Sequence, residues 1–216
     1  IDVAMMRSDY DRFLELCREE LGDSYFLQVY GSDKDYYLPI ARICIQGTYI
    51  YEYYSEHLKF NKGLYLDVFP LDNIPDDENE RAKQERKLLM IDTLLFFKNC
   101  LVYRNGPFKI KLMLKKLIRM ILLPVPYKLL MKLRFRIMRE YSNQTTQSVC
   151  STGSRYGYRK GSHPREIFGE PVLLEFEGKY YYGPSNWDAY LGSVYGNYMK
   201  IPEPENRDPM FEVYKI

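Results

Sequence analysis

The chain has 216 residues, of which 46% are hydrophobic and 28% are charged, and its formal net charge is +2. These values are ordinary for a globular protein, and the length suffices for one domain or for a core with one sizeable appendage. The longest uninterrupted apolar run covers residues 120–127, well short of the roughly 20 residues that span a bilayer. Four scattered cysteines without a Cys-x-x-Cys pair argue against a disulfide framework or a zinc site, so we expect a cytoplasmic protein.

The first 75 residues predict a sheet with one helix. Residues 1–5 form a short apolar strand that contains Asp2. A helix follows, capped by Ser8 and ended by Gly22. Residues 25–30 form the next strand, and residues 41–45 and 48–51 predict a hairpin, with Arg42 near its start. This order indicates an α/β or α+β core with a mixed sheet.

Residues 64–69 predict a buried strand that is closed by Pro70, since proline cannot continue a sheet ladder. Alternation places Asp67 on the face opposite Leu66 and Val68. A carboxylate inside an apolar strand costs several kcal/mol or more unless it is paired or binds a metal. Because Asp2 occupies a similar strand, the pattern predicts two carboxylates that converge on one cation.

The chain has only two histidines, so the ligands of that cation would be oxygen atoms. Oxygen ligands favour magnesium or manganese.

Residues 76–147 predict a helical region, with helices over about 80–103, 108–122 and 127–141. Between Phe108 and Arg139 there are ten basic residues and no acidic one. These residues are either the solvated face of helices packed on the core or a basic amphipathic surface that lies on anionic lipid. Nucleic-acid binding is the weakest alternative, because no DNA- or RNA-binding motif accompanies the charge.

The last third returns to strands and turns. Residues 172–176 and 179–182 predict a hairpin around Glu177-Gly178. Residues 184–194 predict a short helix, with Ser185 as a candidate cap. A polar, proline-rich tail follows, which we interpret as a strap over a site.

Three stretches resemble motifs of the LicD family of phosphotransferases, in the family's order. Residues 1–5 resemble the end of its Trp-Asp-Asp-Asp-Ile-Asp motif, and residues 63–72 resemble its Asp-hydrophobic-Phe-Pro-Leu-Asp strand. Residues 191–202, which include Tyr195-Gly196-Asn197-Tyr198-Met199, resemble its Tyr-Gly-Asp-Tyr-Met-x-x-Pro signature. The resemblance covers the whole chain and implies a nucleotidyltransferase-like fold, related to that of the fukutin-related proteins.

The resemblance also implies a reaction. The family transfers a phospho-alcohol, typically phosphocholine from CDP-choline, with Mg²⁺ to a sugar hydroxyl of a surface glycan such as lipopolysaccharide or a teichoic acid. Asp2 and Asp67 match two of its metal carboxylates, and the first carboxylate would lie two positions before Asp2. We therefore expect upstream residues to complete the metal site. The resemblance and the chemistry make Arg42, Tyr195, Tyr198 and Arg207 candidates for binding the donor or acceptor.

We predict that the chain has three parts: a catalytic core over residues 1–75, a basic helical region over 76–147 and a C-terminal region over 148–216. Asp72 is expected to orient the loop after the Asp67 strand. Removing Asp67 is expected to abolish transfer and leave the fold nearly intact, since it relieves repulsion between like charges. The alternative function is a catalytically incomplete module that binds glycan or, peripherally, the inner membrane face.

Overall fold

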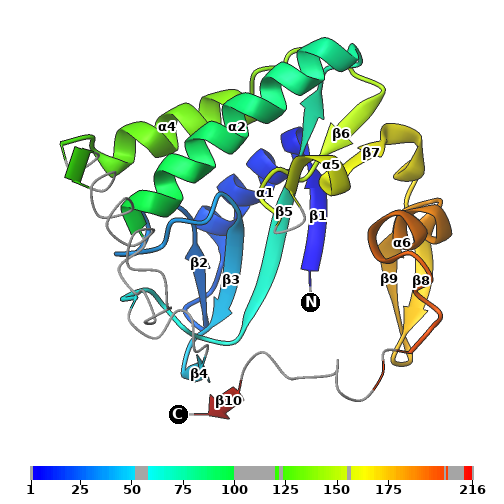
Figure 1. Cartoon of the computed structure of the whole chain (residues 1–216). Helices are drawn as coiled ribbons and strands as arrows, with labels where there is room; N and C mark the ends of the chain where they lie inside the picture. Colours follow the sequence, from blue (N-terminus) through cyan, green and yellow to red (C-terminus); the bar gives the residue numbers. More distant parts are fainter. Residues whose placement is uncertain are drawn as a thin grey trace. The chain divides into compact units, whose positions relative to one another are not determined.

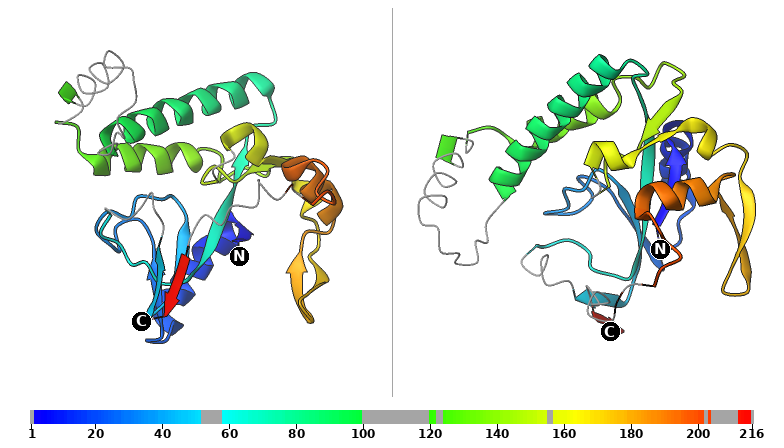
Figure 2. Two further views of the ribbon diagram at one scale, coloured as in Figure 1. Left: turned by 60° about the horizontal axis from the view of Figure 1, so that its bottom comes forward. Right: turned by 45° about the vertical axis from the view of Figure 1, so that its right-hand side comes forward.

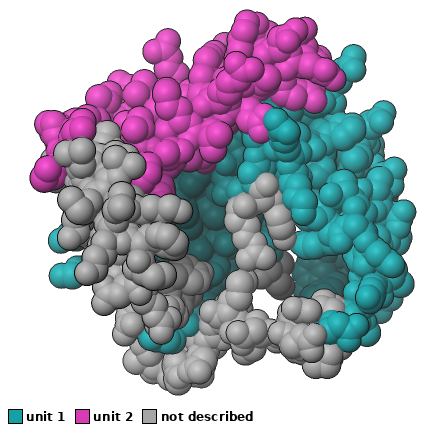
Figure 3. All heavy atoms as spheres, viewed as in Figure 1, with its two compact units in different colours: residues 1–74, 144–216 teal, residues 75–143 magenta. Residues whose placement is uncertain are grey.

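The computed structural model describes residues 2–51, 58–99, 120–121, 124–154, 157–201, 203 and 212–215. The chain forms two compact units, residues 1–74 with 144–216 and residues 75–143, which Figure 3 colours separately. The first unit contains the sheet, and the second contains two long helices. The three-part division suggested by the sequence stays a prediction.

A mixed sheet forms the centre of the first unit (Figure 1). Its strand order is β2-β3-β5-β6-β7, and β1 also pairs with β5. The pair β1–β5 is parallel, whereas the other pairs are antiparallel, so the predicted α+β class with a mixed sheet is confirmed. The strands are β1 (Asp2–Met6), β2 (Tyr25–Gln28), β3 (Ala41–Ile45), β5 (Tyr65–Ile74), β6 (Ser148–Cys150) and β7 (Ser162–Pro164).

Helix α1 (Arg7–Glu20) packs on one face of this sheet (Figure 2). Its Tyr10 forms a buried cluster with Ala41 of β3 and Val68 of β5, and Leu66 packs against the same cluster. Asp67 therefore lies on the opposite face, as the alternation predicts. The helix begins at Arg7 without a side-chain cap and ends at Glu20, so the predicted Ser8 cap is wrong.

Strand β5 continues through Pro70 to Ile74, which corrects the prediction that this proline ends the strand. On one edge, the β3 ladder stops at Val68 and the β6 ladder starts at Asp72. Pro70 lies between these ladders, where a missing N–H interrupts neither. The residue before the strand is Gly63, and only glycine fits there, because a Cβ would lie 2.5 Å from the Ile45 carbonyl oxygen.

The predicted hairpin between β3 and the next strand is also wrong. Strand β4 (Thr48–Tyr51) follows β3 after Gln46 and Gly47, but it pairs with β10 (Glu212–Lys215). Both edges of β3 are already taken, by β2 and β5, so β4 has no edge of β3 left to join. A turn signal in the sequence predicts the change of direction but not the pairing partner.

The second unit contains α2 (Glu78–Asn99) and α4 (Tyr127–Met138), which pack against each other. Gln84 Nε2 donates to the Ile137 carbonyl at 2.9 Å, and Arg134 Nε donates to Asp92 Oδ1 at 2.6 Å. Arg134 is buried, so this basic residue holds two helices together and does not belong to an exposed basic face. Most of the predicted helix over 108–122, with Lys109, Lys111, Lys115, Lys116 and Arg119, lies outside the described residues.

After β6 the first unit continues with α5 (Gly157–Gly161), β7 and the 3-10 helix η1 (Arg165–Ile167). The predicted hairpin is confirmed as β8 (Val172–Phe176) and β9 (Lys179–Gly183), and Figures 1 and 2 show α6 (Trp187–Tyr195) beside it. Asn186 caps α6, in place of the predicted Ser185. Among the residues that the structure describes, no helix is both long and apolar enough to cross a membrane.

Candidate active site

Asp2 and Asp67 are direct neighbours in the structure. They are Cα partners in the parallel pair β1–β5. Partner residues in adjacent strands project from the same face of a sheet, so both carboxylates leave the face opposite α1. Asp2 is exposed and Asp67 is half-buried. Strand pairing thus brings together two acidic residues that are 65 positions apart in the chain.

Arg42 lies on the other side of Asp67, as its Cα partner in β3. The Arg42 Nε donates to Asp67 Oδ1 at 2.7 Å, and the guanidinium lies 3.7 Å from the ring centroid of Tyr65. Burial alone would lower the pKa of the Arg42 guanidinium, but the Asp67 carboxylate, together with Tyr36 and Tyr65, raises it above its usual value. Arg42 is therefore a fixed cation beside the aspartate pair.

A polar row continues from Arg42 across the sheet to Gln28, its Cα partner in β2. Gln28 is fully buried, and its Nε2 donates to Asp33 Oδ2 at 2.6 Å and to the Asn61 carbonyl at 3.0 Å. The sequence reading missed Gln28, although a polar residue inside the apolar stretch over residues 25–30 was a usable signal. On the same face, burial raises the pKa of Cys44 to about 12, so its thiol stays protonated at neutral pH and is a poor nucleophile.

The donor set fits a hard divalent cation. Mg²⁺ is bound in many enzymes through one or two carboxylates, with waters and substrate phosphates completing its shell. Asp2 and Asp67 supply such a pair on one face. Across the described residues, no group of three or more His, Cys, Asp or Glu side chains is arranged to hold a metal. A cation at Asp67 would share the carboxylate with Arg42 or displace the guanidinium.

Asp72 has a structural role. It lies within β5, not in a loop, and it is fully buried. Arg7 binds it through two hydrogen bonds, from Nε to Oδ1 at 2.6 Å and from Nη2 to Oδ2 at 2.9 Å. The paired Asp72 raises the pKa of Arg7, although burial alone would lower it. This ion pair joins the start of α1 to β5, so the expected role in orienting a loop is corrected.

The C-terminal candidates lie on other elements. Tyr195 is exposed at the end of α6, and the Tyr198 hydroxyl donates to Asp188 near the start of that helix. That hydrogen bond raises the pKa of Tyr198. Helix α6 packs on α5 and η1, and neither tyrosine belongs to the strands that pair Asp2 with Asp67. Arg207 lies outside the described residues, and the roles of all three stay predictions.

Comparison with known proteins finds a relative of this chain. Over 218 aligned residues the chain is 24% identical to the lipopolysaccharide cholinephosphotransferase LicD of Haemophilus influenzae. The alignment covers 97% of this chain and 77% of that protein. No protein-family model matches the sequence, and no solved structure matches the fold. The similarity along almost the whole chain supports the assignment to the LicD family that the three sequence motifs predict.

Proposed function

We propose that the protein is a LicD-like transferase that moves a phospho-alcohol, phosphocholine above others, from a CDP-alcohol to a sugar hydroxyl of a surface glycan such as lipopolysaccharide. The observation that carries this proposal is the pairing of Asp2 with Asp67 on one face of the sheet. The similarity to a lipopolysaccharide cholinephosphotransferase supports the reaction class. The proposal places the activity in the cytoplasm, where CDP-alcohols are made.

Asp2 and Asp67 are the residues that would hold Mg²⁺ or Mn²⁺. Bound there, the ion would neutralise charge that builds on the diphosphate oxygens as the donor is cleaved. Arg42 orients the Asp67 carboxylate through its 2.7 Å hydrogen bond. The same guanidinium is a cation that never needs to gain a proton, so it favours binding of the anionic donor beside the aspartates. Packing of Arg42 against Tyr65 keeps it in place.

The direct test measures CMP release from CDP-choline by the full-length protein. The acceptor is lipopolysaccharide without phosphocholine, and the reaction is run with Mg²⁺ and with EDTA. We expect release only with the metal, and a loss of at least about 100-fold in Asp2→Asn, because removing a group that positions the reacting atoms has effects of this size.

Asp9→Asn is the matched control, since Asp9 is exposed on α1, in the neighbouring element. It should retain full activity. CDP-ethanolamine, CDP-glycerol and CDP-ribitol, tested in place of CDP-choline, identify the transferred group. An absence of metal-dependent CMP release with every one of these donors would reject the proposed function.

We also propose that α4 attaches the protein to anionic membrane surfaces. Its exposed side combines basic and apolar residues, namely Lys128, Leu129, Lys132, Leu133 and Arg136. Each basic residue near such a surface contributes about 1 kcal/mol, and the leucines can enter the headgroup region. Flotation with phosphatidylserine vesicles at low salt tests this, with neutral vesicles as the control. A failure to float would remove membrane attachment and leave the transferase proposal intact.

A further inference from the structure

A pocket lies in the first unit, at the far end of β1. It has a volume of about 790 Å³. Met6 contributes to its wall, four residues after Asp2 in β1, which corresponds to about 13 Å at the usual rise of a strand. The pocket is thus distinct from the aspartate pair. Its lining residues are Met6, Thr145, Thr146, Gln147, Ser148, Pro164, Arg165, Glu166 and Gly169.

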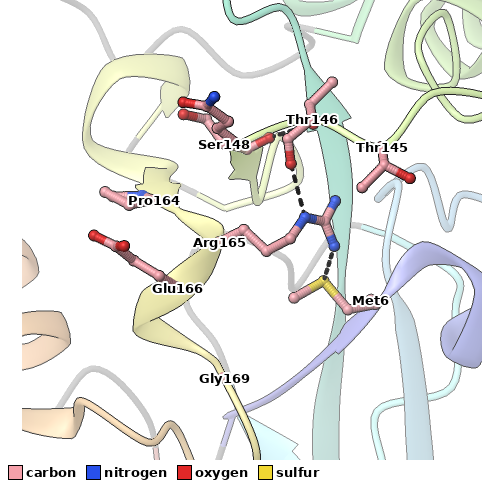
Figure 4. A pocket seen from close by; sticks show the side chains of 9 residues that line it. Met6, Thr145, Thr146, Ser148, Pro164, Arg165, Glu166 and Gly169 are labelled. Carbon is pink, nitrogen blue, oxygen red and sulfur yellow. Dashed lines mark hydrogen bonds between the residues drawn. The ribbon is translucent and has the colours of Figure 1, made fainter.

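Arg165 is the cation of this pocket, and three contacts fix its position, of which Figure 4 shows those to Thr146 and Met6. Its Nε donates to the Thr146 carbonyl at 2.8 Å, its Nη2 donates to Asn73 Oδ1, and its Nη1 lies 3.6 Å from the sulfur of Met6. These contacts come from β1, β5 and the segment before β6. The guanidinium is therefore held in place before any ligand arrives.

Among the residues that the structure describes, Arg165 has no acidic partner that balances its charge. The three groups that hold it are a carbonyl, an amide and a thioether, and no ion pair joins Arg165 to a carboxylate within the described part of the chain. Glu166 follows directly, but Figure 4 shows its carboxylate leaving the backbone in another direction. A half-buried guanidinium without a counter-ion favours an anion in the adjacent space. It also has more N–H groups than these contacts use.

The rest of the wall favours a hydroxylated ligand. Thr145 contributes a hydroxyl and Gln147 a side-chain amide to the wall, whereas the hydroxyl of buried Thr146 donates to the Ser148 carbonyl at 2.7 Å. Thr145 and Gln147 are exposed, so their side chains are accessible from solvent. A volume of about 790 Å³ is within the range of small-molecule sites, which run from roughly 300 to 1,000 Å³.

We propose that this pocket binds an anionic sugar, with the phosphate or carboxylate of the sugar on Arg165 and its hydroxyls on the exposed side chains of Thr145 and Gln147. The nearby Glu166 weakens anion binding through its charge and thereby limits the affinity for simple anions. Because binding to this pocket is measured without a donor or a metal, its result does not depend on whether the protein turns over a CDP-alcohol.

Isothermal titration calorimetry on the intact protein tests the proposal with four probes: glucose 6-phosphate, glucuronate, glucose and inorganic phosphate. We expect glucose 6-phosphate or glucuronate to bind more tightly than either glucose or inorganic phosphate, and the preferred one identifies the anionic group. Arg165→Met should weaken binding at least about tenfold, as expected for the loss of a hydrogen bond to a charged group. Arg165→Lys should retain part of the affinity, because it retains the charge.

Glu166→Gln keeps the test decisive if Arg165→Met fails to fold. Removing the neighbouring negative charge should tighten binding of the anionic sugar by a factor of about two to five. Glu170→Gln is the matched control, since Glu170 is exposed four residues further on and does not line the pocket. The proposal is overturned if neither anionic sugar binds, if inorganic phosphate binds as tightly as they do, or if Glu166→Gln leaves their affinity unchanged.

Discussion

Arg42 and Asp67 are Cα partners in adjacent antiparallel strands, and the Arg42 Nε donates to Asp67 Oδ1 at 2.7 Å. Their side chains are 8% and 14% exposed, so the ion pair is largely removed from water. The carboxylate that we propose as a metal ligand therefore has a permanent counter-charge inside the protein. Asp2, on the other side of Asp67, is exposed and carries its charge into solvent.

Asp67→Asn should destabilise the protein without metal by about 3 kcal/mol, because it leaves the buried Arg42 uncompensated. This reverses the expectation from the sequence that the fold would stay nearly intact without Asp67. Urea unfolding followed by circular dichroism measures the change. The double variant Asp67→Asn with Arg42→Met should recover part of the loss. Unfolding free energies of Asp67→Asn and wild type within about 0.5 kcal/mol would contradict the structural importance of the pair.

Asp2→Asn should behave differently. Its side chain is exposed, so the free energy of unfolding should change by less than about 0.5 kcal/mol. Mn²⁺ affinity, measured by electron paramagnetic resonance of the free ion, should nevertheless fall at least about tenfold if the aspartate pair holds the cation. Adding EDTA should remove any stabilisation by Mn²⁺ in the wild type. Equal Mn²⁺ affinity in the variant and wild type would exclude Asp2 as a ligand.

Asp72→Asn should cost about 3–5 kcal/mol, because Asp72 is fully buried and Arg7 would lose its charged partner. Thermal and urea unfolding both measure this loss. The double variant Arg7→Leu with Asp72→Leu should be less damaging than Asp72→Asn, since it removes both charges and leaves apolar side chains. If the double variant is worse than either single variant, the pair contributes net stability beyond the cost of burying its charges.

The sequence predicted the parts of the fold that depend on local patterns. Alternation placed Asp67 on the face opposite Leu66 and Val68, and the register of β1 with β5 agrees with the expected convergence of Asp2 and Asp67. The pairing partners of the strands were harder to predict. A turn at Gln46-Gly47 does not show that both edges of β3 are already occupied by other strands.

The ion pairs were also beyond the sequence reading. Arg42 and Asp67 are 25 residues apart, and Arg7 and Asp72 are 65 apart, so only the strand register reveals that each charge has a partner. For the same reason Arg134, counted from the sequence within a basic surface, is in fact buried against Asp92. Charge composition predicts the sign of a region but not which charges reach the solvent.

His163 should make the protein less stable as the pH falls below about 6.5. It is buried between the rings of Phe168 and Tyr190, with Nδ1 3.1 Å from the Ser193 hydroxyl. Burial lowers its pKa in the folded state below the usual value of about 6.5. The stabilising contribution of neutral His163 is thus complete above that pH. It is lost as the pH falls toward the folded pKa, since the unfolded chain then binds a proton that the folded protein does not.

His163→Gln isolates this contribution in urea unfolding between pH 5 and 8. The difference in unfolding free energy between wild type and the variant should shrink as the pH falls, by at most about 1.4 kcal/mol per pH unit, the limit for one proton. Ser193→Ala is the control, because it removes a polar contact but leaves the ring buried, and its pH dependence should follow the wild type. A constant difference between wild type and His163→Gln over this range would show that His163 titrates alike in the folded and unfolded chains.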